Sequence, residues 1–273
     1  TPIPRTLALT AYGDLDYSVM DELPPGRQPI NTVHRSESKR PQVMDFIKEE
    51  IANGRQVFVI YPLIEESSKV DYENLMKGYE EVKSFFPEPK YWISMVHGKM
   101  DAKQKETNMQ RFVKGETQIM VSTTVIEVGV NVPNATVMVI ESAEKFGLSQ
   151  LHQLRGRVGR GAEKSFCILL TGPKVSNDAR ERLKIMVATN DGFKIAEKDL
   201  EIRGPGDIEG TKQSGLLNFK LANIVHDKAM LEVARNVAEN LLETDPDIIM
   251  AENLPVKNYL HQQKGKTAWS KIS

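Results

Sequence analysis

Short apolar runs alternate with longer amphipathic segments between residues 29 and 172. The runs are rich in β-branched residues and have the length of strands, and this combination predicts β-strands. They are "INTVH" (30–34), "QVFVIYPL" (56–63), "YWISMVHG" (91–98), "TQIMVST" (117–123), "ATVMVIES" (135–142) and "KSFCILLTG" (164–172). Strands that are apolar on both faces and separated by helices are typical of parallel sheets. The pattern therefore predicts an α/β fold with a doubly wound, mostly parallel sheet flanked by helices.

The intervening segments have helical spacing of their apolar residues. They cover residues 40–54, 70–86 and 101–115, with a short helix near 148–155. We expect Gly54 to end the first helix, because glycine commonly follows a helix C-terminus. Asp101 is the expected N-cap of the third helix and Gly115 its end.

The two ends of the chain differ from this middle part. The first 28 residues contain the proline- and glycine-rich stretch "DELPPGRQP" and are interpreted as the end of a preceding domain and a linker. Residues 173–273 are expected to be mainly helical. They contain two helices joined at "TNDG" (189–192), a glycine-rich loop (203–216), a long amphipathic helix (220–243) and a basic, weakly patterned tail.

Composition excludes several classes of protein. The formal net charge of −1 argues against a stand-alone DNA-coating protein, since phosphate neutralisation needs a strongly basic surface. Cys167 is the single cysteine, which excludes a disulfide framework, and its apolar surroundings in "SFCILL" indicate packing. No stretch approaches the ~18 apolar residues of a membrane span, and no secretion signal is present at the N-terminus. We therefore expect a soluble, cytoplasmic protein, and "TPIPRT" is interpreted as a point inside a longer polypeptide.

A phosphate-loop motif is mimicked by "LHQQKGKT" (260–267) but not completed. The motif G-x-x-x-x-G-K-[ST] needs a glycine at position 260, which is Leu260, and a helix after Thr267. We interpret this stretch as a solvated basic tail. The sequence holds no other such motif and no strand that ends in an Asp-Glu pair, so the main parts of a nucleoside-triphosphate site are missing from it.

The stretch "MVSTTVIEVGVNVPNA" (120–135) leaves a predicted strand and enters a turn. Ser122, Thr123 and Thr124 bring hydroxyl and amide groups to the carboxyl end of that strand, and such groups donate well to phosphate oxygens. Gly129 permits close approach of another group to the backbone. The alternative is an ordinary strand-to-helix turn.

The stretch "QLRGRVGRG" (153–161) concentrates arginine and glycine. On a helix Arg157 and Arg160 would share a face, because they are three residues apart. Guanidinium groups form forked bonds with phosphate oxygens. Gly156 and Gly159 each cost about 1 kcal/mol in a helix interior, which indicates a functional constraint. The alternative is a solvated basic loop.

A third stretch, "FKIAEKDLEIRGPGDIEGTKQSG" (193–215), places Arg203 before a Gly-Pro-Gly turn and Gln213 in a glycine-rich loop. A polar loop of this composition is interpreted as a moving part or as a domain connector.

Together these stretches resemble the second motor domain of superfamily 2 helicases, and within it the RecG family of double-stranded-DNA translocases. "VFVIYPLIEES" (57–67) is similar to motif IV, "VHGKM" (96–100) to the segment that follows it, "VSTTVIEVGVNVPNA" to motif V and "QLRGRVGRG" to motif VI. "TPIPRT" resembles the end of motif III, and residues 183–215 resemble the translocation motif shared with the transcription-repair coupling factor. The resemblance implies a RecA-like sheet.

The resemblance also implies roles for single residues. Arg157 and Arg160 would be arginine fingers that reach the γ-phosphate of ATP bound, with Mg²⁺, on the preceding RecA-like motor domain. Gln153 would contact the nucleotide, and Gly129 and Asn131 would lie near it. Asn131 departs from the family, which commonly has aspartate there, and an amide brings a hydrogen bond without a charge.

The remaining roles concern DNA. Ser122, Thr123 and Thr124 would face the nucleic-acid backbone, and Arg203 and Gln213 would couple the helical hairpin to movement on the duplex. The implied function is that of the C-terminal half of an ATP-dependent helicase acting on branched double-stranded DNA in fork reversal, Holliday junction processing, repair and recombination. Single-strand-binding protein is a further candidate partner, and association with the bacterial nucleoid is expected. The alternatives are a transcription-repair coupling translocase and a non-catalytic RecA-like scaffold.

Overall fold

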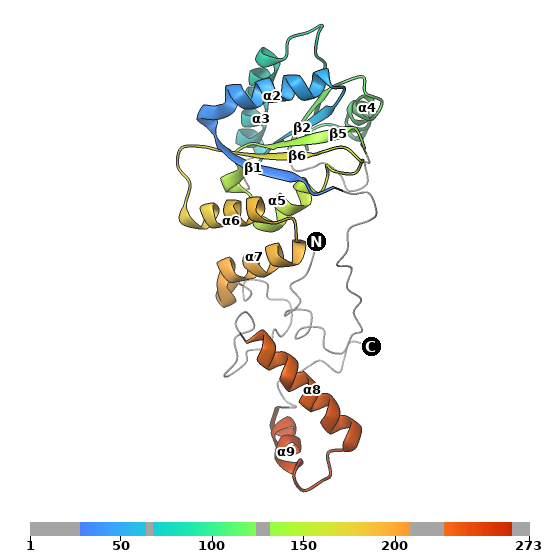
Figure 1. Ribbon diagram of the computed structural model, residues 1–273, viewed down its shortest axis with the longest axis vertical. Helices are drawn as coiled ribbons and strands as arrows, with labels where there is room; N and C mark the ends of the chain where they lie inside the picture. The colour runs from blue at the N-terminus through green and yellow to red at the C-terminus, as the bar shows by residue number, and fades with distance from the viewer. Residues whose placement is uncertain (1–27, 64–67, 124–131, 208–226, 264–273) are drawn as a thin grey trace. The chain divides into compact units, whose positions relative to one another are not determined.

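The computed structural model describes residues 28–63, 68–123, 132–207 and 227–263. Its centre is a sheet of six strands in the order β1-β6-β5-β2-β4-β3, and every neighbouring pair runs parallel (Figure 1). The strands are β1 (Asn31–Ser36), β2 (Gln56–Tyr61), β3 (Ile93–Val96), β4 (Ile119–Thr123), β5 (Ala135–Ile140) and β6 (Phe166–Thr171). The prediction of a doubly wound parallel sheet is confirmed.

Helices cover both faces of the sheet. Those in the sheet-bearing part are α2 (Arg40–Ala52), α3 (Ser68–Phe85), α4 (Ala102–Val113), α5 (Leu148–Arg155), α6 (Asn177–Ala188) and α7 (Gly192–Asp207), with short 3-10 turns η1 (Glu37–Lys39) and η2 (Ala143–Lys145). The four helices predicted before residue 172 are all present, and so are the two joined at residues 189–191. Asp101 caps α4 as expected, because its carboxylate accepts a hydrogen bond from the Gln104 amide at 2.8 Å.

Two hydrophobic cores lie against the two faces. Val59 and its alternate neighbours along β2 pack on α2 and α3, whereas Phe58 and Ile60 point to the opposite core, which includes residues of α4, α5 and α6. Figure 1 shows α2 and α3 on one side of the sheet and α5 and α6 on the other. Because both faces are covered, the central strands are buried along their length, as their apolar runs require. Cys167 is fully buried in β6, and burial raises the pKa of its thiol to about 12, which fits a packing residue.

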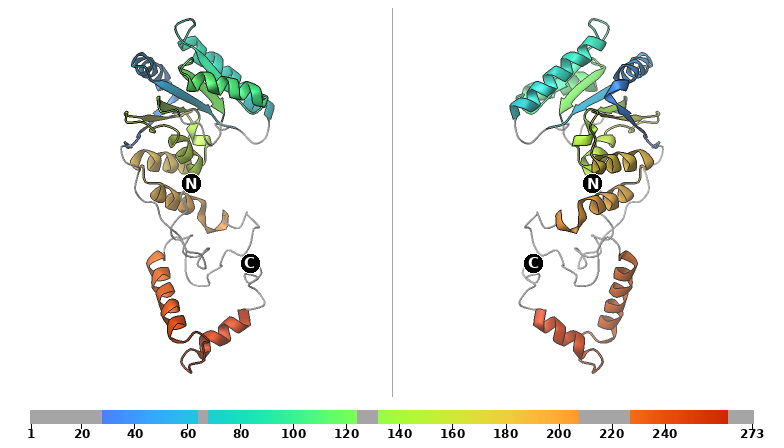
Figure 2. Two further views of the ribbon diagram at one scale, coloured as in Figure 1. Left: turned by 90° about the vertical axis from the view of Figure 1, so that its right-hand side faces the viewer. Right: turned by 90° about the vertical axis from the view of Figure 1, so that its left-hand side faces the viewer.

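The chain divides into two compact units, and the sheet with the residues up to Asp199 belongs to the first. Within it, α6 and the first half of α7, up to Asp199, form a hairpin (Figure 2). Ion pairing of Lys198 with Glu181 at 3.5 Å joins these two helices, and Asp199 accepts a hydrogen bond from Ser149 of α5 at 2.8 Å. The hairpin is therefore fastened to the sheet-bearing unit through α5.

The second unit contains α8 (Lys228–Thr244) and α9 (Leu254–Gln263). Asp245 is buried between them and accepts hydrogen bonds from the amides of Ile249 and Met250 and from the side chain of Asn253. These bonds lower the pKa of Asp245, and the bond from the Asn253 side chain has the largest effect on it. The carboxylate thus replaces the backbone partners that the turn between the helices lacks.

Two expectations for the C-terminal part need correction. Helix α7 continues to Asp207, so Gly-Pro-Gly after Arg203 forms its last turn, where the missing proline N–H costs few hydrogen bonds. The amphipathic helix was expected over residues 220–243, but Asp227 is its N-cap and the helix begins at Lys228. Residues 254–263 are helical, in agreement with a mainly helical C-terminal part, and "KGKT" lies outside the described residues. Among the described helices, none is both long and apolar enough to cross a membrane.

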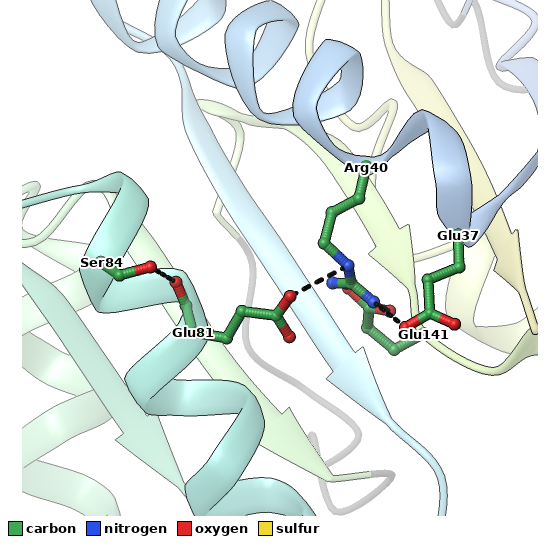
Figure 3. A network of polar contacts seen from close by, with 5 residues as sticks. All are labelled: Glu37, Arg40, Glu81, Ser84 and Glu141. Atoms are coloured by element: carbon green, nitrogen blue, oxygen red, sulfur yellow. Dashed lines mark hydrogen bonds and ion pairs between the residues drawn. The ribbon is translucent and has the colours of Figure 1, made fainter.

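A buried charge pair joins α2 to the end of β5. Arg40 donates two hydrogen bonds to the Glu141 carboxylate, at 2.6 and 2.8 Å, and it also pairs with Glu81 of α3 at 3.3 Å (Figure 3). Burial alone would lower the pKa of Arg40, but the hydrogen bond to Glu141 raises it. Burial raises the pKa of Glu141, and the hydrogen bond and charge of Arg40 act in the opposite direction. The forked geometry is that of two charged groups, so we take the pair as ionised.

Replacing Glu141 with alanine should lower the free energy of unfolding by about 3–5 kcal/mol, because a buried guanidinium loses its main partner. Urea unfolding followed by circular dichroism measures this change. The control is Glu81→Ala, which removes an exposed carboxylate from the same guanidinium and should cost less than about 1 kcal/mol. Equal losses in the two variants would contradict the assignment of Glu141 as the structural partner.

Candidate functional site

Ser122 and Thr123 end β4 at the carboxyl edge of the sheet. Both side chains are buried, and the Ser122 hydroxyl donates to the carbonyl oxygen of Thr123 at 2.8 Å. The Thr123 hydroxyl is buried without a hydrogen-bond partner within the described part of the chain. Thr124, Gly129 and Asn131, which sequence analysis also assigned to this stretch, lie outside the described residues.

Two neighbouring strands end in similar groups. Tyr61 of β2 is the register partner of Thr123, and His97 follows β3 at the position beside Thr123 on the other side. The Tyr61 hydroxyl and His97 Nδ1 are also buried without a hydrogen-bond partner among the described residues. Three adjacent strands thus present unpaired polar atoms in one row, an arrangement that is costly without a partner.

Sequence reasoning assigned no role to Tyr61 or His97, although their position just at or after a strand end was a usable signal. Burial raises the pKa of Tyr61 and lowers the pKa of His97, and the charges of Lys105 and Lys99 lower the latter further. Cations near His97 give this end of the row a positive character. The other end differs, because the carboxylates of Glu141 and Glu81 act on Tyr61.

The arginine motif lies elsewhere. Helix α5 carries the chain away from the end of β5 and ends at Arg155, so the helix stops before Arg157 and Arg160. The expectation that these two arginines share a helix face is therefore wrong. Gly156 follows the last helical residue, and Gly159 has φ +73°, in the left-handed region that takes the chain off the helical path.

Residues 156–162, named the arginine loop here, lie where strands begin. The carbonyl oxygen of Ala162 accepts a hydrogen bond from Gln28, just before β1, at 2.9 Å. A side chain at Gly161 would lie 3.2 Å from the carbonyl oxygen of Pro133, just before β5. Because all strands are parallel, the arginine loop is at the amino edge of the sheet and Thr123 is at the carboxyl edge. The structure does not bring the two predicted groups together.

Arg157 is half-buried in this loop, and Arg160 is exposed. Gln153 is exposed on α5, one turn before the loop. Arg203 lies in α7, and Gln213 lies outside the described residues. The described residues contain no group of three or more His, Cys, Asp or Glu side chains that could hold a metal ion.

Arg155, the first arginine of the motif, has a different environment. Its side chain is buried and donates to the carbonyl oxygens of Met186 at 2.8 Å and Thr189 at 2.9 Å, with a longer bond of 3.3 Å to the Thr32 hydroxyl. Burial lowers the pKa of Arg155. This residue therefore joins the end of α5 to the end of α6, and it is not available to a ligand.

Comparisons with known proteins place the chain among helicases. Residues 38–162 match the family model described as helicase conserved C-terminal domain, and residues 189–273 match the model described as ATP-dependent DNA helicase RecG, domain 3, C-terminal. The chain is 54% identical over 258 residues to a protein of Synechocystis sp. named ATP-dependent DNA helicase RecG, covering 94% of this chain and 31% of that protein. The Bacillus subtilis protein of the same name is 52% identical over 245 residues, covering 90% of this chain and 36% of that protein.

A solved structure of RecG bound to a three-way DNA junction matches with a TM-score of 0.66 and 44% sequence identity, over 85% of this chain and 30% of that one. The fold and the motifs on its two edges define the class: this is a RecA-like helicase C-terminal domain followed by helices. The chain belongs to the RecG family, and it spans about a third of the length of the relatives that it matches.

Arg155→Met should lower the free energy of unfolding by about 2–4 kcal/mol, because the carbonyl oxygens of Met186 and Thr189 lose their donor in a buried position. Chemical unfolding of the chain measures the loss. Arg180→Met on the exposed face of α6 is the control and should change stability by less than about 0.5 kcal/mol. A value for Arg155→Met as small as that of the control would contradict a structural role.

Proposed function

We propose that this chain is the C-terminal part of an ATP-dependent translocase or helicase that acts on branched double-stranded DNA, in replication-fork reversal, Holliday junction processing, repair and recombination. The observation that carries the proposal is the identity of about half of all residues, over more than nine-tenths of the chain, with a protein named as an ATP-dependent DNA helicase. The match of residues 189–273 to the RecG model favours this function over transcription-repair coupling.

In this proposal Arg157 and Arg160 act on ATP that is bound, with Mg²⁺, by a preceding RecA-like motor domain. ATP supplies the phosphoryl group that is transferred to water, and the arginines stabilise the charge that develops on it. The exposure of Arg160 at the amino edge supports a partner outside this unit. Gln153, Gly129 and Asn131 are proposed to lie near the same nucleotide.

The carboxyl edge is proposed to hold the DNA backbone through Ser122, Thr123 and Thr124. The unpaired hydroxyl of Thr123 supports this proposal, because a buried donor without a partner is costly and a phosphate oxygen would satisfy it. A hydroxyl that binds a phosphate oxygen does not contact the bases, so binding at this edge would depend on the shape and charge of the DNA and not on its sequence.

Arg203 and Gln213 are proposed to couple the α6–α7 hairpin and the segment after it to movement along the duplex. Single-strand-binding protein is a proposed further partner, and a cytoplasmic, nucleoid-associated location follows from DNA as the substrate. Separate edges for nucleotide and DNA allow each to be contacted without blocking the other.

The chain alone should show no DNA-stimulated ATP hydrolysis, because its sequence contains neither a complete phosphate loop nor a strand ending in paired carboxylates. A coupled ATPase assay with a branched DNA substrate tests this, with the longer protein as the positive control. Hydrolysis by the chain that is lost in its Arg160→Ala variant would show a complete site here and overturn the proposal.

In the longer protein, Arg160→Ala should leave ATP affinity within about threefold and lower the ATPase kcat by about 10³-fold or more, the magnitude seen for arginine fingers. Nucleotide binding is measured by fluorescence titration and turnover by steady-state kinetics. The matched control is Arg180→Ala, an exposed arginine of α6, which should keep normal turnover. An Arg160→Ala enzyme with unchanged kcat would refute the finger assignment.

A further inference from the structure

Residues 28–31 lead into β1 and contact the arginine loop and the residues that follow it. The side-chain amide of Gln28 donates to the carbonyl oxygen of Ala162 at 2.9 Å. The Asn31 amide donates to the carbonyl oxygen of Ser165, also at 2.9 Å. Between these bonds the side chain of Ile30 is buried, with 8% of its surface exposed. The entering segment is thus attached on both sides of Ile30.

Ile30 packs on the residue that precedes Arg160. Gly159 has φ +73°, and a Cβ placed on it would lie 2.9 Å from Cγ1 and 3.3 Å from Cδ1 of Ile30. Carbon atoms do not approach this closely, so the site excludes any side chain at 159 unless Ile30 moves. The backbone conformation also favours glycine. The isoleucine therefore sets the path of the backbone directly before Arg160.

The opposite end of the loop is held by the sheet itself. Glu163 pairs with Arg55, just before β2, at 2.6 Å, and Gly161 approaches the carbonyl oxygen of Pro133. These contacts do not involve Gln28 or Ile30. Gly161 and Glu163 are thus held from the residues before β5 and β2, whereas Ala162 and Gly159 are contacted by the segment that enters β1.

We infer that Gln28 and Ile30 are positioning residues for Arg160, because they fasten the segment entering β1 to the arginine loop. This inference rests on the proposed function, in which Arg160 must reach a nucleotide held by a domain that precedes residue 28. The contacts of Gln28 and Ile30 with the arginine loop then join the segment between the two domains to the loop that carries Arg160. Small errors in such placement are expensive, since a displacement of about 1 Å can cost 10²-fold in rate.

The test compares Ile30→Ala, Gly159→Ala and Gln28→Ala in the longer protein with the wild type. The alanine variants at 30 and 159 should lower the ATPase kcat by about tenfold or more, and Gln28→Ala by less, while KM for ATP stays within about twofold. Ile30→Val keeps the γ-carbon nearest to Gly159, loses only Cδ1, and should restore most of the turnover. A uniform loss of folded protein would not produce this split between kcat and KM.

Two controls separate positioning from general destabilisation. Gly115→Ala introduces the same backbone conflict, with φ +76°, but no atom lies within 4 Å of the added carbon. Val43→Ala truncates a buried β-branched residue of α2, which packs on the other face of the sheet. Both variants should keep wild-type kcat at a temperature where they remain folded. A loss of kcat in either control equal to that of Ile30→Ala would overturn the inference.

Arg160→Ala in the same assay distinguishes the two claims. If Arg160→Ala loses turnover but Ile30→Ala and Gly159→Ala do not, the positioning inference is wrong and the proposed function stands. If Arg160→Ala keeps turnover, the proposed function fails, and hydrogen exchange on the chain itself decides the attachment. There Ile30→Ala should accelerate amide exchange in residues 156–160 at least tenfold relative to Val43→Ala, and an unchanged rate would overturn the inference.

Discussion

Every strand of the sheet runs in the same direction, and this constraint organises the rest of the molecule. A parallel sheet requires the chain to return from the carboxyl edge to the amino edge after each strand. Helix α5 makes one of these returns, so motif residues that are close in sequence are divided between the two edges: Thr123 ends a strand, and the arginine loop precedes one. The separation of the proposed DNA and nucleotide contacts is therefore a consequence of topology.

Buried polar groups hold the helices that return the chain to the amino edge of the sheet. Arg40 and Arg155 are both buried, and each is satisfied by fixed acceptors: a carboxylate for the first and backbone carbonyls for the second. Such pairs contribute little net stability, but they cost several kcal/mol when one partner is lost, so they select one arrangement of the helices over its neighbours. The Thr123 hydroxyl and His97 Nδ1 have no such acceptor or donor among the described residues, whereas the Tyr61 hydroxyl is near the Arg40 guanidinium.

Much of the fold could be predicted because its signals are local. Continuous apolar runs and helical spacing predicted the six strands and the helices α2 to α7 of the described residues, including α5 with its observed bounds. Helices were also expected in the C-terminal part, but the bounds of the helix over residues 254–263 were not predicted, since it is short and its apolar residues are largely exposed. The helical face assumed for Arg157 and Arg160 was also wrong, because a left-handed glycine beside Ile30, 129 residues earlier, decides the path. Contacts of that kind leave no periodic trace in a sequence.

The three arginines of "QLRGRVGRG" show why residue type alone could not assign the site. They lie within six residues and share one chemistry, yet Arg155 is buried under carbonyl oxygens, Arg157 is half-buried and Arg160 is exposed. A guanidinium surrounded by backbone acceptors has its donors occupied and its position fixed, whereas an exposed guanidinium is accessible from outside the fold. The partners of Arg155 include the carbonyl oxygens of Met186 at the end of α6 and of Thr189 just after it, both beyond the motif itself. The motif thus contains both the exposed arginine proposed to act on ATP and a buried arginine that holds its own helix in place.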